Sequence, residues 1–569
     1  MEAESGCNVV PCSGPTSTSS SIRSILRHHI SVNITRLAVN SKIVCTTDDD
    51  LGVLLVMCSS VRCISLAFFL FSFDMMSTHS VRTAILVMVV SAVASLQGQE
   101  SHVEEQQVTF VPHWVQDAIF YQIFPERFAN GDSSNDRPGV QPWGGMPTPR
   151  NFFGGDLQGI LDHLDYISSL GANTLYLNPI FQSSSNHKYN TDDYLRIDSA
   201  FGNEAMFSKL VSECHARGIR VILDGVFNHT GTGFFAFKDI KENGAKSKYL
   251  GWYNVYSLPL APPNKPNYEG WWGYGDLPKL MTHNPDVRDY IYKVTEHWLK
   301  LGIDGWRLDV PNEIPHPFWI EWRKYVKSLN PDAYIVGEIW DDARPWLQGD
   351  QFDAVMNYQF RKACLDFFVT RRTTAPAFDS ALSRLRAEYP ADVNRAMQNL
   401  LGSHDTERLL TLCGNDRTRM ELAWLFQMTY VGAPMVYYGD EIGMTGGKDP
   451  GCRGTMIWDE KKQDTVLLEC MKDLISLRKS YSSFRRGDFQ TLLADFGTNV
   501  YAFQRKDKEG SCVVILNNSH EPQSAAIAAK GIDKRWKQVW PVSAIVTATN
   551  GTIRTTIPPM SGQVFIGEK

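Results

Sequence analysis

From residue 118 to residue 439 the chain alternates short apolar segments with longer amphipathic ones, and this alternation limits the fold more than any other feature. The longer segments place apolar residues at positions i, i+3, i+4 and i+7, as in Phe207, Leu210, Val211 and Cys214. Eight strands separated by helices predict an α/β fold of the closed (β/α)8 TIM-barrel type. The predicted strands are 118–124, 173–178, 220–227, 303–310, 334–339, 354–358, 397–403 and 435–439.

Carboxylates stand at the C-terminal ends of three predicted strands. Asp309 and Glu338 end the segments 303–310 and 334–339, and Asp405 follows the segment 397–403. Burying an ionisable group is costly unless it serves a polar site, and the strand C-termini of a TIM barrel form the mouth where active sites lie. Any one of the three could equally cap a helix. Together they indicate an active site.

Two of these carboxylates suit the hydrolysis of a glycosidic bond with retention of configuration. That reaction needs a nucleophilic carboxylate and a protonated carboxyl group about 5 Å apart. Arg307 precedes Asp309 by two positions, so strand alternation puts both on the inward face, and we expect its charge to keep Asp309 ionised as the nucleophile. Glu338 has no cationic neighbour in sequence, and we expect it to stay protonated as the acid/base.

Two stretches depart from the barrel pattern. Residues from about 230 to 282 are rich in Gly, Pro, Tyr and Trp and are too long for a βα loop, so they predict a subdomain after the third strand that overhangs the mouth. Residues 485–569 show short alternating segments separated by turn signals, which predict a C-terminal antiparallel β-sandwich. The catalytic barrel is thereby assigned to residues 112–484.

The first hundred residues differ in composition from the rest. Residues 1–74 begin with a Ser/Thr-rich stretch. We expect translation to start at Met75 or Met76, so that this extension is a mis-predicted part of the coding sequence, or else is disordered. Residues 75–99 contain Arg82, an apolar run over 84–93 and the small-residue pattern Ala92-Val93-Ala94, which is typical of a secretory signal peptide. We therefore expect a secreted, extracellular protein. A membrane anchor that carries an extracellular catalytic domain is the alternative.

The net charge of −6, with interspersed signs, argues against two classes of partner. No basic stripe for nucleic acid and no cationic amphipathic helix for a membrane surface is visible, so we expect neither a nucleic-acid nor a stable membrane partner. The 15 Trp and 21 Tyr residues suit a protein that stacks aromatic rings on sugars, although packing also explains many of them.

Four segments stand in order along the chain: Asp224-Gly225-Val226-Phe227-Asn228-His229, Gly305-Trp306-Arg307-Leu308-Asp309, Gly337-Glu338-Ile339-Trp340 and Leu401-Gly402-Ser403-His404-Asp405. They resemble segments of the α-amylase family of glycoside hydrolases, and the similarity spans roughly residues 112–569. Within that family the chain is similar to the neopullulanase, cyclomaltodextrinase and maltogenic amylase group. The resemblance implies a retaining hydrolase of α-1,4 bonds in maltooligosaccharides, starch or cyclodextrins, with some transglycosylation.

The resemblance also implies roles for individual residues. Asp309 would be the nucleophile, Glu338 the acid/base and Asp405 the stabiliser of the transition state. Tyr189 would stack under the sugar being cleaved, and Asp449 with Arg453 would bind the non-reducing end of the substrate. The full set of substrate-binding residues implied in this way is His187, Tyr189, His229, Arg307, Trp340, His404, Asp449 and Arg453.

A loop after the first strand concentrates hard oxygen ligands of the kind that Ca²⁺ prefers. Composition alone does not separate a calcium site from an ordinary surface loop. The resemblance favours a structural calcium ion that braces the loop, because the group's calcium site uses this arrangement. The implied ligands are Asn130, Asp132, Asn135, Asp136, Gly154 and Asp156.

The chain departs from this group at three places. Met281 stands where the group's fifth segment usually ends in Asn, and Pro311 stands where the group has Ala. The group's N-terminal dimer-forming β-sandwich has no counterpart before Trp114, so we expect a monomer with a smaller preference for cyclodextrin over starch. The alternatives are an α-glucosidase or α-1,6-acting relative and, in another class, a non-catalytic membrane ancillary protein with the same barrel.

Overall fold

The computed structural model describes residues 111–529, 535–542, 544–547 and 551–568. The expected extension at 1–74 and the expected signal peptide at 75–99 lie outside these residues. Within the described part of the chain, no helix is both long enough and apolar enough to cross a membrane.

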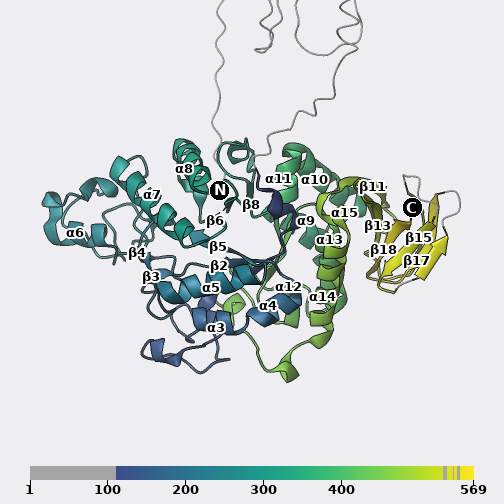
Figure 1. Ribbon diagram of the computed structural model, residues 1–569, viewed down its shortest axis with the longest axis horizontal. Helices are drawn as coiled ribbons and strands as arrows, with labels where there is room; N and C mark the ends of the chain where they lie inside the picture. Colours follow the sequence, from purple (N-terminus) through teal and green to yellow (C-terminus); the bar gives the residue numbers. More distant parts are fainter. Residues whose placement is uncertain (1–110, 530–534, 543, 548–550, 569) are drawn as a thin grey trace, which may run out of the picture. The chain divides into compact units, whose positions relative to one another are not determined.

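A parallel sheet of eight strands forms the centre of the described structure (Figure 1). Its strand order is β8-β7-β6-β5-β2-β1-β10-β9, and a bridge between Met356 and Gln398 brings its two edges together into a nearly closed barrel. The predicted barrel is therefore confirmed, with most strand ends one to three residues inside the predicted bounds and with β10 beginning two residues earlier than predicted. The strands are β1 Phe120–Ile123, β2 Thr174–Leu177, β5 Arg220–Gly225, β6 Gly305–Leu308, β7 Tyr334–Gly337, β8 Ala354–Val355, β9 Gln398–Leu400 and β10 Ala433–Tyr437.

Helices alternate with these strands because each connection presents an apolar stripe to the sheet. The sequence-predicted helix around Phe207 is α5, whose buried residues are those of the predicted stripe, and its first turn is capped by the side chain of Asn203. The α-helices are α2 Pro125–Phe128, α3 Leu157–Asp162, α4 Leu164–Leu170, α5 Glu204–Ala216, α6 Phe235–Asn243, α7 Pro285–Lys300, α8 His316–Leu329, α9 Tyr358–Cys364, α10 Ala375–Glu388, α11 Ala391–Ala396, α12 Leu409–Leu412, α13 Arg417–Thr429, α14 Thr465–Ser480 and α15 Ser482–Arg486.

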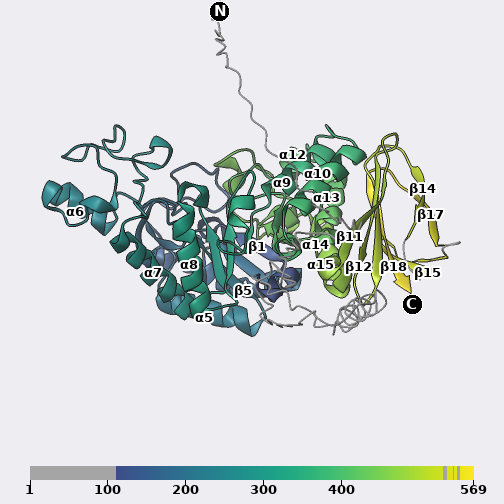
Figure 2. The same ribbon diagram turned by 90° about the horizontal axis from the view of Figure 1, so that it is seen from above.

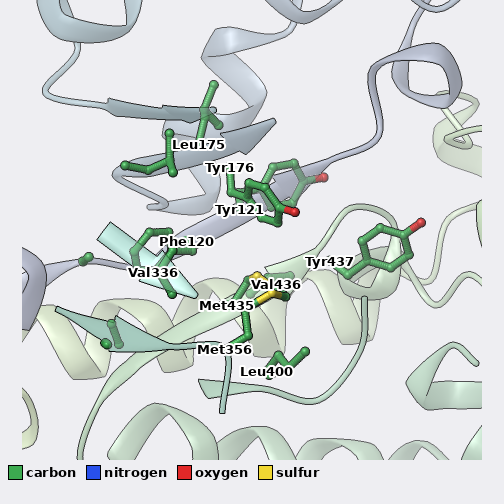
Figure 3. Packing of buried hydrophobic residues seen from close by; sticks show 14 of the residues in the cluster. Phe120, Tyr121, Leu175, Tyr176, Val336, Met356, Leu400, Met435, Val436 and Tyr437 are labelled. Carbon is green, nitrogen blue, oxygen red and sulfur yellow. The ribbon is translucent and has the colours of Figure 1, made fainter. Parts of the chain in front are cut away.

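Side chains fill the barrel interior, as expected of a TIM barrel, which has a packed core and no pore. Phe120, Val336, Met356 and Met435 come from different strands or strand ends and are all at most 2% exposed. Figure 3 shows them directed into one apolar cluster. The core below the mouth is therefore largely apolar.

Two excursions leave the barrel near its mouth. The hairpin of β3 Phe181–Ser183 and β4 Thr191–Ile197 follows β2. After β5, residues 230–282 contain α6 and several single-turn helices, and they rejoin the barrel through bridges such as His229 with Lys279. Because these segments carry little regular structure, their shape depends on aromatic packing, for example of Phe237 against Tyr253 and Tyr268.

The C-terminal strands are antiparallel, as predicted. They form a larger sheet of order β11-β12-β13-β18-β15-β16 and a smaller sheet of β14 and β17, which Figure 2 shows beside the larger one. Val513, Ile515, Ile527 and Ile553 are buried together between the strands. The bounds are β11 Asp488–Ala494, β12 Val500–Lys506, β13 Ser511–Asn517, β14 Gln523–Ala528, β15 Arg535–Trp540, β16 Ala544–Thr547, β17 Thr552–Ile557 and β18 Ser561–Glu568.

A carboxyl group just after β10 makes the stability of the fold dependent on pH. Glu441 is fully buried, where its Oε1 accepts hydrogen bonds from the hydroxyls of Tyr121 and Tyr166, both at 2.7 Å. Burial raises the pKa of Glu441 to about 7, although the two hydroxyl donors oppose this shift. The folded protein therefore holds a proton on Glu441 at a pH where the unfolded chain has lost it.

We predict that the melting temperature falls as pH rises from about 4.5 to about 7. Protonated Glu441 contributes its full stability below the pKa that this group has in the unfolded chain, and the contribution is lost as pH rises through the pKa of the group in the folded protein. The contribution is on the order of 3 kcal/mol. Glu441→Gln stays neutral and should flatten this pH dependence, whereas the exposed Glu460→Gln should not. Thermal unfolding at pH 5 and pH 8 tests this, and equal pH dependence in both variants would contradict it.

Candidate active site

Arg307 stands at the centre of the polar cluster at the barrel mouth. It is fully buried on β6, and the strand register pairs it with Asp224 of β5. Its Nη1 lies 2.8 Å from Asp224 Oδ1 and 3.0 Å from Asp309 Oδ1, and its Nη2 lies 2.6 Å from Glu338 Oε2. One guanidinium therefore holds carboxylates from three neighbouring strands.

The contact between Arg307 and Glu338 corrects one expectation. The sequence suggested that Glu338 has no cationic neighbour, but the cation reaches it across the sheet from β6. Neighbours on an adjacent strand are invisible to an argument from spacing along one strand. The predicted contact of Arg307 with Asp309 is confirmed, but the guanidinium does not serve Asp309 alone.

The two carboxyl groups at the strand ends have raised pKa values. Burial raises the pKa of Asp309 well above its usual range and raises that of Glu338 as well, while Arg307 opposes the shift in both. Arg307 therefore favours the ionised form of Asp309, as expected, but burial and the neighbouring acids, first among them Glu338, outweigh its effect on the pKa. Two buried carboxyl groups that share one guanidinium ionise as a pair, because a negative charge on one disfavours a negative charge on the other.

Trp340 adds a directed hydrogen bond to this pair. Its Nε1 donates to Glu338 Oε1 at 3.1 Å, and this bond lowers the pKa of Glu338 against the larger effect of burial. The indole stacks on the ring of Tyr358 at 3.7 Å and is 47% exposed. One edge of Trp340 thus contacts the carboxyl group while part of the ring faces solvent.

Asp405 lies in a second cluster of charges. Its Oδ1 is 3.0 Å from Arg453 Nη2 and its Oδ2 is 3.0 Å from His404 Nε2. Burial alone would raise the pKa of Asp405, but His404, Arg453 and Arg307 together hold it below its usual value. Asp449 is 3.2 Å from Arg453, so this guanidinium links the two acids.

A hydrogen-bonded row of side chains supports the ring of Tyr189. Its hydroxyl donates to Asp224 Oδ2 at 2.8 Å and lies 2.7 Å from His404 Nε2, and the two rings are nearly parallel at 5.5 Å. Gln122 Nε2 lies 2.8 Å from His404 Nδ1, so the amide donates to Nδ1 and the ring proton is on Nε2. Tyr176 also donates to Asp224.

Three histidines of the site are neutral at ordinary pH. Burial lowers the pKa of each of His187, His229 and His404 to about 3. His187 Nδ1 accepts from the backbone N–H of Tyr189 at 3.1 Å. The Nε2 of His229 is buried and has no hydrogen-bond partner among the described residues, which leaves it free for a ligand hydroxyl.

The backbone is strained directly after Asp309. Val310 has φ 37° and ψ 49°, a left-handed conformation that a β-branched residue rarely adopts. Pro311 follows and begins a single helical turn over Pro311–Glu313. Such strain is common where a side chain is held for function, and here it lies in the segment that aims Asp309 into the mouth.

The sequence argument did not single out several residues that the structure brings into the site. Gln122, Tyr176 and Tyr358 are all at most 4% exposed, and the first two take part in the network around Asp224 and His404. A signal for Gln122 existed, since a buried amide inside an otherwise apolar strand needs a polar partner. Tyr358 carried no such signal because aromatic residues are common in any core.

The predicted calcium loop divides into two groups of side chains. The carboxylate of Asp156 accepts four N–H donors, from Gly131, Asp132, Gly159 and the amide of Asn135. The carboxylate of Asp132 accepts from Ser134. Both carboxylates are thus already engaged in holding the loop.

Asn130, Asp136 and Gly154 form the second group. Asn130 Nδ2 is 3.0 Å from Asp136 Oδ1, and a Cβ on Gly154 would stand 2.2 Å from that oxygen. Asn135 Oδ1 is buried without a partner. Among the described residues, no group of three or more His, Cys, Asp and Glu side chains could hold a metal ion.

Paired buried carboxyl groups on adjacent strand ends, with aromatic and imidazole side chains around them, define a barrel hydrolase that acts on sugars. Comparison with known proteins agrees with this class. Residues 122–482 match the family described as "Alpha amylase, catalytic domain". The chain therefore belongs to the α-amylase family.

The chain is similar to characterised members of that family over most of its length. It is 47% identical to neopullulanase 2 of Thermoactinomyces vulgaris, over 82% of this chain and 80% of that protein. It is 51% identical to a cyclomaltodextrinase of Thermoanaerobacter pseudethanolicus, over 74% of each. A solved cyclic α-maltosyl-(1→6)-maltose hydrolase of Arthrobacter globiformis is 42% identical, with a TM-score of 0.74, over 80% of this chain and 99% of that one.

The hydrogen bond from Trp340 gives a prediction about pH. Trp340→Phe removes the donor that favours ionised Glu338, so the pKa of Glu338 should rise and the alkaline limb of the kcat/KM profile should move to higher pH. Trp114→Phe, which loses an indole bond to the carbonyl of Asp332, is the control and should leave the profile in place. An alkaline limb that stays fixed or moves to lower pH in Trp340→Phe would contradict the assignment.

Proposed function

We propose that the chain is an α-glucan hydrolase of the neopullulanase and cyclomaltodextrinase group that cleaves α-1,4 bonds of maltooligosaccharides and cyclodextrins with retention. One observation carries this proposal: the carboxylates of Asp309 and Glu338 each contact one terminal nitrogen of the Arg307 guanidinium. Retaining enzymes hold their two carboxyl groups about 5 Å apart, closer than inverting enzymes do. The identity to neopullulanase 2 supports the same substrate class.

In the proposed mechanism the Asp309–Glu338 pair carries one proton, and the productive form has it on Glu338. Glu338 gives this proton to the departing glycosidic oxygen while Asp309 attacks the anomeric carbon and forms a glycosyl ester. Glu338, now ionised, takes a proton from a water molecule while the oxygen of that water attacks the anomeric carbon. The ester bond to Asp309 breaks, and the sugar leaves with its original configuration. Arg307 remains charged throughout and limits the repulsion between the two carboxyl groups.

The surrounding residues hold the reacting sugar. Asp405, ionised beside Arg453, accepts hydrogen bonds from two sugar hydroxyls and favours the positively charged transition state. His229 donates through its unpartnered Nε2, and Tyr189 supports one face of the ring. These groups are already fixed by the network around Asp224, so little reorganisation opposes the reaction.

Asp309→Asn and Glu338→Gln should each lower kcat by at least about 10³-fold, because each removes a charge or a proton donor at nearly constant shape. Turnover of a nitrophenyl maltoside and of maltoheptaose measures both effects, and circular dichroism checks the fold. Azide should partly restore the turnover of the nitrophenyl substrate by Glu338→Ala, because the activated leaving group departs without a proton from an acid. Near-normal turnover in either carboxamide variant would exclude the assigned roles.

We further propose a structural calcium ion at the loop that follows β1. The buried, unpartnered Asn135 Oδ1 and the carboxylate of Asp136 beside Asn130 would supply oxygen donors, and Gly154, whose Cα lies close to Asp136, would add its carbonyl. Asp156 and Asp132 would contribute from the positions in which they hold the loop. The ion would brace the loop and would take no part in proton transfer.

Chelation should therefore lower the melting temperature of the protein, and Asp136→Ala should abolish that sensitivity. Asp162→Ala, an acid in the following helix α3, serves as the control and should remain sensitive. Melting curves with and without chelator give the result. A wild-type protein that melts at the same temperature after metal removal would exclude the site.

Three finer proposals rest on the sequence alone. They are secretion after a signal peptide at 75–99, a monomeric state, and a smaller preference for cyclodextrin over starch than the group shows. Light scattering and paired kcat/KM values test the last two. Cleavage of α-1,6 bonds is the second candidate activity, favoured by the similarity to the maltosyl-(1→6)-maltose hydrolase of Arthrobacter globiformis. Product profiling on pullulan separates the two bond types.

A further inference from the structure

A buried lysine lies between two residues of the sugar-binding set. Lys188 stands in the loop that joins β3 to β4, with His187 before it and Tyr189 after it. It is 1% exposed, and its Nζ lies 2.9 Å from Asp198 Oδ2. Burial lowers the pKa of Lys188 to about 8 while the charge of Asp198 opposes the shift, so the side chain is largely charged at neutral pH. A buried cation at this place needs an explanation, because lysine is rarely buried unless it is paired.

The backbone of Lys188 adopts a left-handed conformation. Its φ is 65°, in a region that few residues other than Gly and Asn occupy, because the Cβ comes too close to a carbonyl oxygen. The residues on either side of this bend contact each other. The rings of His187 and Tyr189 stack at 5.9 Å, and the N–H of Tyr189 donates to His187 Nδ1 at 3.1 Å. The orientation of Tyr189 therefore depends on an unfavourable conformation of the residue before it.

Asp198 is held in place by groups other than the lysine. It is fully buried directly after β4, where its Oδ2 accepts the backbone N–H of Ser183 on β3 at 2.9 Å and its Oδ1 accepts that of Ala200 at 3.0 Å. Arg137 Nη2, from the loop that follows β1, lies 2.7 Å from the same Oδ2. The carboxylate therefore gives the ammonium group of Lys188 a fixed partner, and it would remain paired if the lysine were replaced.

The other contacts of the ammonium group are also outside the sugar-binding set. Lys188 Nζ lies 4.8 Å from the centroid of the Phe201 ring and 5.6 Å from that of Phe152. Neither of these residues, nor Asp198, is assigned to sugar binding. We therefore expect the ammonium group to act on the reaction through the backbone that it anchors.

We propose that Lys188 is a positioning residue for the catalytic step, because its ion pair with Asp198 holds the strained backbone that sets His187 and Tyr189 against the sugar being cleaved. This inference rests on the proposed function. Tyr189 lies nearly parallel to the ring of His404, so a shift of the loop would disturb the surface that supports the sugar. Displacement of a reacting group by about 1 Å can lower a rate by about 10²-fold.

Two substitutions separate the ion pair from the backbone conformation. Lys188→Met removes the charge but keeps the Cβ, so the left-handed backbone loses the ion pair that offsets its strain. For both maltoheptaose and a nitrophenyl maltoside, kcat should fall about 30-fold while KM changes less than about threefold. Lys188→Gly also removes the charge, but Gly adopts this conformation without strain, so kcat should fall less than about fivefold. Lys300→Met breaks an exposed pair with Glu296 and is the matched control, which should change neither constant.

A loss of packing alone would give the opposite order, because Gly removes more of the buried side chain than Met does. Lower kcat in Lys188→Gly than in Lys188→Met would therefore overturn the inference. An unchanged kcat with a lower melting temperature in Lys188→Met would overturn it as well, since the lysine would then be only structural.

Crystal structures of the two variants give a result that does not depend on activity. The parallel stack of Tyr189 on His404, with ring centroids 5.5 Å apart, should be lost in Lys188→Met and kept in Lys188→Gly. A stack that is kept in Lys188→Met would contradict the inference. If the wild-type protein cleaves no maltooligosaccharide, the proposed function fails, and these structures still decide whether Lys188 places Tyr189.

Discussion

The buried charge of Arg307 is the interaction on which the rest of the site depends. A guanidinium out of contact with water is tolerated only when acids compensate it, and removing one partner of a buried pair is far more costly than removing both. Asp224 is its partner by strand register, at 2.8 Å, and is also fully buried. The order β5, β6, β7 therefore places Asp309 and Glu338 beside one cation before any substrate binds.

The need to pair each buried polar group also extends the hydrogen-bond network to neighbouring strands and loops. Asp224 accepts from Tyr176 and Tyr189 as well as from Arg307, and Tyr189 reaches His404. Each of these side chains thereby finds a partner in another, which restricts the freedom of all of them. Polar groups that are fixed in this way before the substrate binds stabilise the charge of the transition state without having to reorganise. This explains why side chains outside the reacting pair are also buried.

The sequence predicted the large features because they depend on periodicity and strand order. The eight barrel strands follow from alternating apolar segments, and Asp309, Glu338 and Arg307 follow from their places at strand ends. Contacts across strands could not be read in this way. The contact of Arg307 with Glu338 comes from register between β6 and β7, and it reversed the expectation that Glu338 lacks a cation.

The sequence also did not predict which side chains are exposed or which hydrogen bonds they form. Trp272 reads as one more aromatic residue in a Trp-rich stretch, and only the structure shows that its ring is open and its edge is held by Glu313. Asp132 and Asp156 read as simple calcium ligands, but their carboxylates also accept N–H groups of the loop. Local side-chain to backbone bonds of this kind depend on loop geometry, which composition does not determine.

The central claim is that Asp309 forms a covalent bond to the sugar. A fluorinated α-glucosyl substrate with a good leaving group, incubated with Glu338→Gln, should accumulate the glycosyl enzyme, because release of the sugar from Asp309 needs the base that this variant lacks. Peptide mass spectrometry should then find one added sugar on the peptide that contains Asp309. A label on another residue, or an inverted product with no label under conditions of turnover, would contradict the account.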